Sequence, residues 1–400
     1  MRFFSKPAQR RITIPGCTSC IRLSALALLG TGLNWLTLGP VQAQDSDERL
    51  RLTPAEQVAA AFADPDWESP QMSWGDPNLE GTFTSRDMSG VPMERSPEHG
   101  ARQSLTTEQF QQRLSGGNVG LAALRGGEEF EGQARFQLSA LDSSELGTRS
   151  FGYTSYVIDP EDGRTPALTD EGRQRQAARR GGGQANGPFF SMQDFSFYDR
   201  CITRGVTGSI MPSLYGDAMR IVQSPTEVAI SYEMLHDTRI IPLDGRTPAD
   251  SGIRQYMGSS VGHWEGDTLV IETTNFTDEL AVGRYPHSED LVLTERITRI
   301  DPDMINYVVT VNDPRTFERP WSFRLTLTTQ PGYSILEYSC HEGNFFVASA
   351  LRAETRYQER VAEAAANGEP IPERSTGDAA GLSIYEAPSA IDALDINAAE

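Results

Sequence analysis

Residues 291–329 read LVLTERITRIDPDMINYVVTVNDPRTFERPWSFRLTLTT, and this stretch decides the fold. It holds three runs that are rich in β-branched and aromatic residues, the composition favoured in strands. Turn-forming residues separate the runs, with DPD between the first two. Because no pattern of helical length interrupts them, we predict consecutive antiparallel strands.

Further strand-like runs lie on both sides of this stretch. They are EVAISYEML and DTLVIETTNF before it and YSILEYSC after it, with turn chemistry such as PLDGRT, EGD and QPGY between runs. A meander this long must close or stack to hide its edge strands. We therefore predict a mainly β fold, an antiparallel up-and-down β-barrel, with a β-sandwich as the alternative.

The rest of the chain is organised around this strand-rich part. We predict a signal peptide (1–43), an N-terminal helix and wrapping segment (44–188), the barrel core (189–351), a C-terminal helix (352–368) and a disordered acidic tail (369–400). The wrapping segment is too rich in Gly, Pro and Ser to hold its own core. We expect it to contribute a strand, within LEGTFTS, to the barrel.

The first 43 residues are typical of an export signal. Five basic residues, an apolar run and a small-residue site, VQA ending at Ala43, follow one another. The run is short and interrupted for a membrane span, so an uncleaved anchor is the weaker alternative. We predict a periplasmic or secreted protein, and the pair Arg10 and Arg11 leaves the twin-arginine and general routes both open.

The charge of the chain excludes several partners. The net charge is −20, and removal of the signal with its five basic residues leaves 30 basic against 55 acidic residues, or −25. An acidic surface repels nucleic acid and anionic membranes, so we predict neither as a partner. The expected partner is a small molecule, and the sequence leaves the oligomeric state open.

Two of the four cysteines, Cys17 and Cys20, lie inside the signal, so their spacing is not a metal or redox motif of the mature protein. Cys201 and Cys340 remain. In an oxidising compartment we predict a disulfide between them. Two buried free thiols or a catalytic cysteine are the alternatives.

Strand parity identifies Glu295 as the leading candidate for a functional residue. It shares a face with Leu293 and Ile297, which places a carboxylate among inward apolar side chains. A buried carboxylate must either hold an arginine or have a raised pKa. We therefore weigh a structural Glu–Arg pair against a general acid or base. Arg239 is a candidate counter-ion for Glu295 or for an anionic ligand.

Two polar residues follow inward apolar rows at strand ends. His236 continues the alternation of Tyr232 and Met234, and Asn275 continues that of Leu269 and Ile271. We interpret His236 as a candidate proton carrier at a cavity mouth and Asn275 as a candidate ligand contact. Each also has a plain structural reading, as a strand-end histidine and a locally bonded amide.

The stretch YSCHEGNFF (338–346) places His341 directly after Cys340. If it is a strand, Tyr338 and Cys340 face one way, while Glu337 and His341 face the other. This argues against a Cys–His nucleophile pair and leaves His341 as a candidate acid or base. A metal site is the weakest reading, and we expect no organic cofactor.

The stretch GHWEGDTLV places Trp264 and Glu265 beside a turn at Gly266 and Asp267. The two are candidates for the rim of a ligand cavity, although turn formation alone explains the stretch.

Several motifs together resemble a large bacterial family of exported proteins over residues 74–356. The motifs are WGDPNLEGTF, PMER, DPEDGRTPALT, DRCITRG, HDTRIIPLDG, MGSSVGHWEGDTLVIETTNF, LTERIT, VNDPRTFERPW and EYSCHEGNFF. The chain departs from the family at Phe83, where tryptophan is usual, and at His263, where arginine is more frequent. The resemblance implies a lipocalin-like barrel and no defined activity.

Two functions follow from these expectations. The first is an exported enzyme, a lyase, isomerase, dehydratase or hydrolase, in which Glu295, His236 and His341 move protons. Arg239 and Asn275 would orient the substrate, with the rim residues and residues 337–338 as further contacts. The second is a non-catalytic carrier or sensor for a small ligand. A structural envelope protein is a third reading and predicts a filled barrel.

Overall fold

The computed structural model describes residues 54–63, 66–115, 151–178, 188–213, 216–283, 285–330 and 332–373. All of these belong to one compact unit within Arg49–Glu400. The predicted export signal, both of its cysteines, and the predicted acidic tail from residue 374 onward lie outside the described residues.

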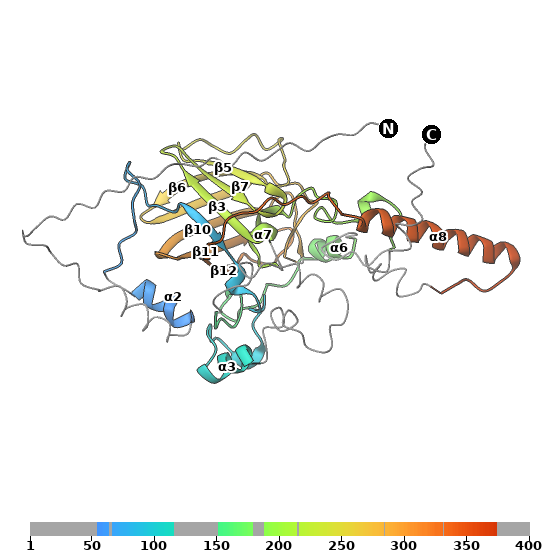
Figure 1. Cartoon of the computed structure of the whole chain (residues 1–400), viewed down its shortest axis with the longest axis horizontal. Coiled ribbons are helices and arrows are strands. Elements are labelled where there is room, and N and C mark those ends of the chain that lie inside the picture. Colours follow the sequence, from blue (N-terminus) through green and yellow to red (C-terminus); the bar gives the residue numbers. More distant parts are fainter. Residues whose placement is uncertain are drawn as a thin grey trace, which may run out of the picture. The chain divides into compact units, whose positions relative to one another are not determined.

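The fold is mainly β, as predicted, and its centre is one large antiparallel sheet (Figure 1). The strands of this sheet are β1 (Gly81–Thr84), β2 (Val157–Asp159), β3 (Ala218–Gln223), β4 (Glu227–Tyr232), β5 (Thr238–Pro242), β6 (Ser259–Glu265), β7 (Thr268–Thr274), β10 (Val292–Asp301), β11 (Met304–Asn312) and β12 (Trp321–Thr328). A separate two-stranded sheet pairs β8 (Ala281–Val282) with β9 (Tyr285–Pro286).

Helices lie around the sheet. They are α2 (Pro54–Ala63), α3 (Thr107–Ser115), α6 (Asp170–Ala178), α7 (Gly205–Ile210) and α8 (Phe346–Asn367). A helix was expected from residue 352, and α8 begins earlier, at Phe346, and ends as expected at Gly368, whose φ is +68°. Among the described residues, no helix is both long and apolar enough to cross a bilayer.

The strand order of the large sheet follows the chain. The row runs β5-β4-β3-β1-β12-β11-β10-β7-β6, with β2 pairing beside it on β12. Read from β1 through β3, β4 and β5, and then from β6 through β7, β10, β11 and β12 back to β1, it is a sequential meander. The strand expected in LEGTFTS is β1, which joins the two halves by pairing with β3 and β12.

The two end strands, β5 and β6, meet through side chains. The guanidinium of Arg239 on β5 donates to Ser260 Oγ on β6 at 3.0 Å. A methyl group added to Gly262 of β6 would lie 2.8 Å from Ile241 Cγ2 of β5, so the approach of the strands requires glycine. The sheet therefore bends far enough to bring its ends into contact.

Large apolar side chains fill the interior side of the sheet. Trp321, Tyr307, Phe83 and Phe323 are all buried, within one continuous core cluster. Full burial of such a side chain stabilises the fold by about 1.5–3 kcal/mol. Phe83, at the position where the resembled family has tryptophan, occupies the core.

The strand expected in YSILEYSC is absent, and residues 333–339 have no regular secondary structure. β12, the preceding strand, pairs with β11 along its whole length on one edge, and β2 and β1 occupy parts of its other edge, which leaves too short a run of free backbone for a further strand. Side chains hold the segment instead, because Glu233 accepts hydrogen bonds from Tyr333 Oη (2.7 and 2.6 Å) and from the Leu336 amide (2.9 Å). We call residues 332–345 the C-terminal strap.

Candidate functional site

Glu295 lies on the buried face of the sheet, as the alternation of side chains along its strand predicted. It forms an ion pair with Arg239. Its side chain is 0% exposed and that of Arg239 is 4% exposed. Arg239 Nη1 donates to Glu295 Oε1 at 2.9 Å, and Arg239 Nη2 donates to Oε2 at 2.6 Å. This two-pronged contact matches the fork of a guanidinium to a carboxylate. The arrangement is that of the structural Glu–Arg pair, one of the two readings of the sequence.

Four hydroxyl groups from neighbouring strands surround this pair. Arg239 donates to Tyr232 Oη at 3.1 Å and to Thr273 Oγ1 at 3.1 Å. Tyr307 Oη donates to Glu295 Oε1, and Ser260 Oγ, 2.9 Å from Thr273 Oγ1, accepts from Arg239. We call these six residues the Arg239–Glu295 cluster. Because they stand on six different strands, the cluster braces the sheet across its interior.

The electrostatics keep the cluster in one protonation state. Burial alone would lower the pKa of Arg239, but the charge of Glu295 raises it well above its usual value. Burial raises the pKa of the Tyr307 phenol, and the negative charge of Glu295 raises it further. Burial likewise raises the pKa of Tyr232. Arg239 therefore stays charged and both phenols stay neutral, which leaves them as fixed hydrogen-bonding groups.

His236 does not lie on the inward row that the sequence suggested. The alternation holds through the buried Met234, but the chain then turns, and Leu235 and His236 both have positive φ. The exposed His236 ring accepts a hydrogen bond from the Tyr338 amide at its Nε2 (3.2 Å). Period-two parity applies only inside a regular strand, and β4 ends at Tyr232.

Asn275 is also not an inward group. It follows the last residue of β7 and has a φ of +58°, which turns its side chain away from the sheet interior. Its Nδ2 donates to the carbonyl of Ala249 at 2.7 Å and holds the preceding loop. The Asn275 amide is thus hydrogen-bonded locally, which is one of the two alternatives that the sequence predicts. The inward polar residue of β7 is Thr273, which is fully buried.

The predicted residues of YSCHEGNFF lie on the C-terminal strap. Cys340 Sγ and Cys201 Sγ are 2.00 Å apart, so the predicted disulfide pair is present. His341 and Glu337 are exposed, and the expected opposition of two strand faces does not apply because the strand is absent. Tyr338 Oη lies 3.1 Å from Tyr198 Oη. The disulfide and the contact between Tyr338 and Tyr198 fasten the strap.

Trp264 and Glu265 end β6 at the two-residue turn that joins it to β7. Trp264 packs against the core, and Glu265 pairs with Arg296 at 2.9 Å. Gly266 has the expected positive φ of +58°. Turn formation and packing account for the residues expected at a ligand rim.

The three residues predicted to move protons are thus not brought together. Among the contacts of the described residues, none joins Glu295 to His236 or His341. A hollow bordered by Leu293, two positions from Glu295, has a volume of about 10 Å³, room for about one water molecule. The described residues also contain no group of three or more His, Cys, Asp or Glu side chains suited to a metal ion.

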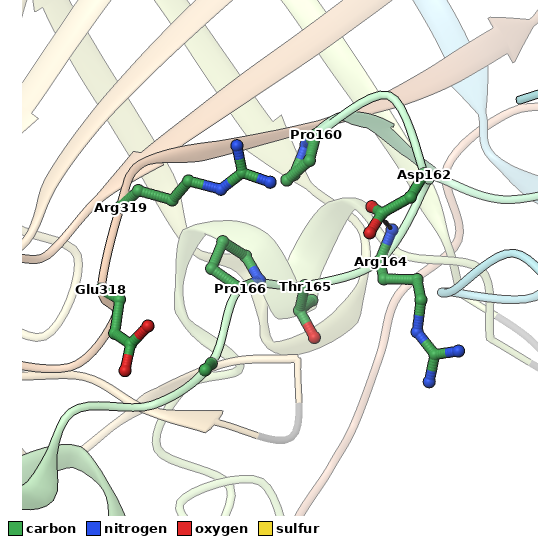
Figure 2. Close-up of a pocket in the computed structure, with 8 residues that line it drawn as sticks. Pro160, Asp162, Arg164, Thr165, Pro166, Glu318 and Arg319 are labelled. Carbon is green, nitrogen blue, oxygen red and sulfur yellow. Dashed lines mark hydrogen bonds between the residues drawn. The ribbon is translucent and has the colours of Figure 1, made fainter.

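A much larger hollow opens on the surface of the protein (Figure 2). Its volume is about 380 Å³, within the usual range for small-molecule sites. Its lining residues are Pro160, Asp162, Arg164, Thr165, Pro166, Ala167, Glu318 and Arg319. They come from the loop after β2 and the loop before β12, two of the stretches behind the family resemblance. We call this hollow the 160–319 hollow.

Backbone hydrogen bonds hold the two loops of the hollow together. The amide of Glu318 donates to the Ala167 carbonyl at 3.0 Å, and the amide of Thr169 donates to the Thr316 carbonyl at 3.0 Å. The pairing of β2 with β12 continues this contact. The walls therefore belong to the sheet framework, and the hollow is preformed.

The buried residue Arg95 holds the loop after β2 in place through hydrogen bonds. Its amide donates to the Gly163 carbonyl at 2.9 Å, and its Nη1 donates to the Glu161 carbonyl at 2.5 Å. Gly163 has a φ of +69°, and a methyl group there would lie 2.7 Å from the Arg95 side chain. Only glycine fits this turn.

The charged groups on the wall differ in what they contact. Asp162 Oδ1 accepts from the Arg164 amide at 3.0 Å, which closes the turn, and Arg164 Nη2 lies 4.0 Å from Glu94. Arg319 and Glu318 are exposed, and their side chains have no hydrogen bond or ion pair with any residue in the described part of the chain. This pair remains available to a ligand.

No protein-family model, curated protein or solved structure matches the chain. The resemblance to an exported bacterial family stays a prediction.

Proposed function

We propose that this chain is an exported small-molecule-binding protein that uses the 160–319 hollow as its binding site. This choice favours the carrier or sensor over the acid–base enzyme. The main support for the proposal is the contrast between the two candidate sites, Glu295 and the 160–319 hollow. The carboxylate of Glu295 is occupied by Arg239, whereas the hollow is preformed and open, and two of its charged lining residues, Glu318 and Arg319, have no side-chain partner among the described residues.

The proposal gives the sheet the role of a rigid scaffold. The sequential order of the strands and the contact of Arg239 on β5 with Ser260 on β6 support an up-and-down barrel of the lipocalin-like kind, joined between β5 and β6 by side chains. The buried Trp321 and Tyr307, with the Arg239–Glu295 cluster, occupy its interior. A barrel whose interior is filled with side chains binds its ligands at the loops.

The disulfide supports the proposed compartment. Cys201 and Cys340 fasten the C-terminal strap to the segment before α7. Disulfides persist in oxidising compartments and are rare in the cytosol. Together with the export signal expected from the sequence, this favours a periplasmic or secreted protein.

The test fills the hollow without touching its charges. Ala167→Trp places a large ring on the wall, and Ala362→Trp on the exposed face of α8 is the matched control. The protein is screened by thermal shift against a library of small polar metabolites, and each compound that binds is measured by calorimetry. We expect Ala167→Trp to lose the ligand and Ala362→Trp to keep it. If Ala167→Trp binds as tightly as the wild type, the hollow is not the binding site.

A further inference from the structure

We infer that the 160–319 hollow takes a small zwitterion, an amino acid or a closely similar molecule, which places its carboxylate on Arg319 and its ammonium on Glu318. The inference rests on the proposed function, because it names the ligand class of the same site.

The charge of the hollow points to a ligand that carries both signs. Its lining holds two arginines, Arg164 and Arg319, and two acids, Asp162 and Glu318, so its formal charge is zero (2 − 2). The chain as a whole carries −20. A simple anion meets repulsion from such a surface, and a simple cation is attracted to all of it without preference. A molecule that is neutral overall but charged at both ends is complementary to this hollow.

Of the charged residues on the wall, Arg319 and Glu318 are the two whose side chains are available to bind a ligand. Asp162 is engaged by the turn it closes, and Arg164 faces Glu94. Arg319 and Glu318 have no side-chain partner among the residues that the structure describes. Exposed charges are ordinarily satisfied by solvent, but these two border a preformed hollow from adjacent positions. In Figure 2 the Arg319 side chain extends toward Pro160, and that of Glu318 points in a different direction. Both side chains line the same hollow and carry opposite charges, which suits a ligand that carries both signs.

The remaining walls suit the carbon skeleton of such a ligand. Pro160 and Pro166 contribute rings and no backbone N–H group. The hydroxyl of Thr165 is already used, because it donates to Glu94 and lies 2.8 Å from Tyr285 Oη. Polar recognition therefore falls on Arg319 and Glu318. The planar fork of an arginine is matched to a carboxylate, which assigns the carboxylate end of the ligand to Arg319.

The experiment removes one charge at a time from the ligand and from the protein. Each of the twenty free amino acids is titrated by calorimetry into the wild-type protein. The tightest binder is then compared with its N-acetyl derivative, which lacks the ammonium, and with its amide, which lacks the carboxylate. The variants are Arg319→Ala and Glu318→Ala. Arg356→Ala, on the exposed face of α8, is the control.

We expect the free amino acid to bind wild type about tenfold more tightly than either derivative, the lower end of the effect of a charge-assisted hydrogen bond. Arg319→Ala should abolish the preference for acid over amide only. Glu318→Ala should abolish the preference for free amine over N-acetyl only, and Arg356→Ala should keep both.

Two failures are distinguishable. If no amino acid binds, the ligand class is wrong, and if both preferences survive in Arg319→Ala and Glu318→Ala, the assignment of the ligand's two charges to these residues is wrong. The proposed function still stands in that case when Ala167→Trp abolishes the binding of some other metabolite. If Ala167→Trp abolishes nothing, the binding site itself is refuted, and the inference falls with it.

Discussion

Replacing Glu295 with glutamine tests whether the Arg239–Glu295 cluster is a structural brace. The carboxylate accepts two bonds from Arg239, at 2.9 and 2.6 Å, and another from Tyr307. Glutamine removes the negative charge and turns an NH₂ donor toward other donors. Arg239, 4% exposed, would then be a buried charge without a counter-ion. Breaking a buried pair in this way costs about 3–5 kcal/mol.

The free energy of unfolding is measured by urea titration followed by circular dichroism. The control is Glu265→Gln, which breaks an ion pair of similar length, 2.9 Å to Arg296, between exposed side chains. An exposed pair contributes about 0–1 kcal/mol, so the control should be nearly neutral. The double variant Glu295→Leu with Arg239→Met should recover most of the loss, because apolar replacement of a whole buried pair is often neutral.

Two results would refute this reasoning. A loss below about 1 kcal/mol for Glu295→Gln would mean that the pair does not brace the sheet. A variant that stays folded and still binds ligand, but loses a catalytic turnover found in the wild type, would restore the acid–base enzyme predicted from the sequence.

Two further predictions concern the disulfide and an exposed ion pair. Cys201→Ser with Cys340→Ser opens a loop with a sequence separation of 139 and should lower the free energy of unfolding by about 3–5 kcal/mol, measured by urea titration; no change would show that the strap is held without the covalent bond. Hydrogen bonds from Arg246 lower the pKa of Asp244 from 3.8 to about 2. Because the folded-state pKa is the lower one, the stabilising contribution is present above pH 3.8 and is lost as the pH falls through about 2. A carboxyl titration by NMR should find the midpoint near 2 and a higher midpoint, still below 3.8, in Arg246→Ala, because that variant keeps the backbone amide that donates to Asp244; equal midpoints would contradict the assignment.

Sequence reasoning succeeded where the chain is regular. Glu295 lies in the middle of β10, where alternation is strict, so parity placed it inward beside Leu293 and Ile297. The cost of burying a carboxylate then indicated an arginine, and Arg239 was the named candidate. The antiparallel sheet followed from the same periodicity.

It failed where the regular backbone ends. His236 and Asn275 stand just beyond strand ends with positive φ, and parity has no meaning there. YSILEYSC has the composition of a strand, but strand formation also requires a free edge, which a linear pattern does not reveal. The 160–319 hollow joins loops that are far apart in sequence. Both stretches belong to the motifs of the family resemblance, but their contact is a property of the tertiary structure.

The contact between β5 and β6 has a mechanical consequence. At most other junctions of the large sheet, backbone ladders of several residue pairs bind neighbouring strands, whereas β1 and β12 share a single pair. Between β5 and β6 the load falls on side chains such as Arg239 and Ser260. A pulling force should therefore open the molecule along this line before it separates strands joined by long ladders, and the salt bridge between Arg239 and Glu295 resists that opening.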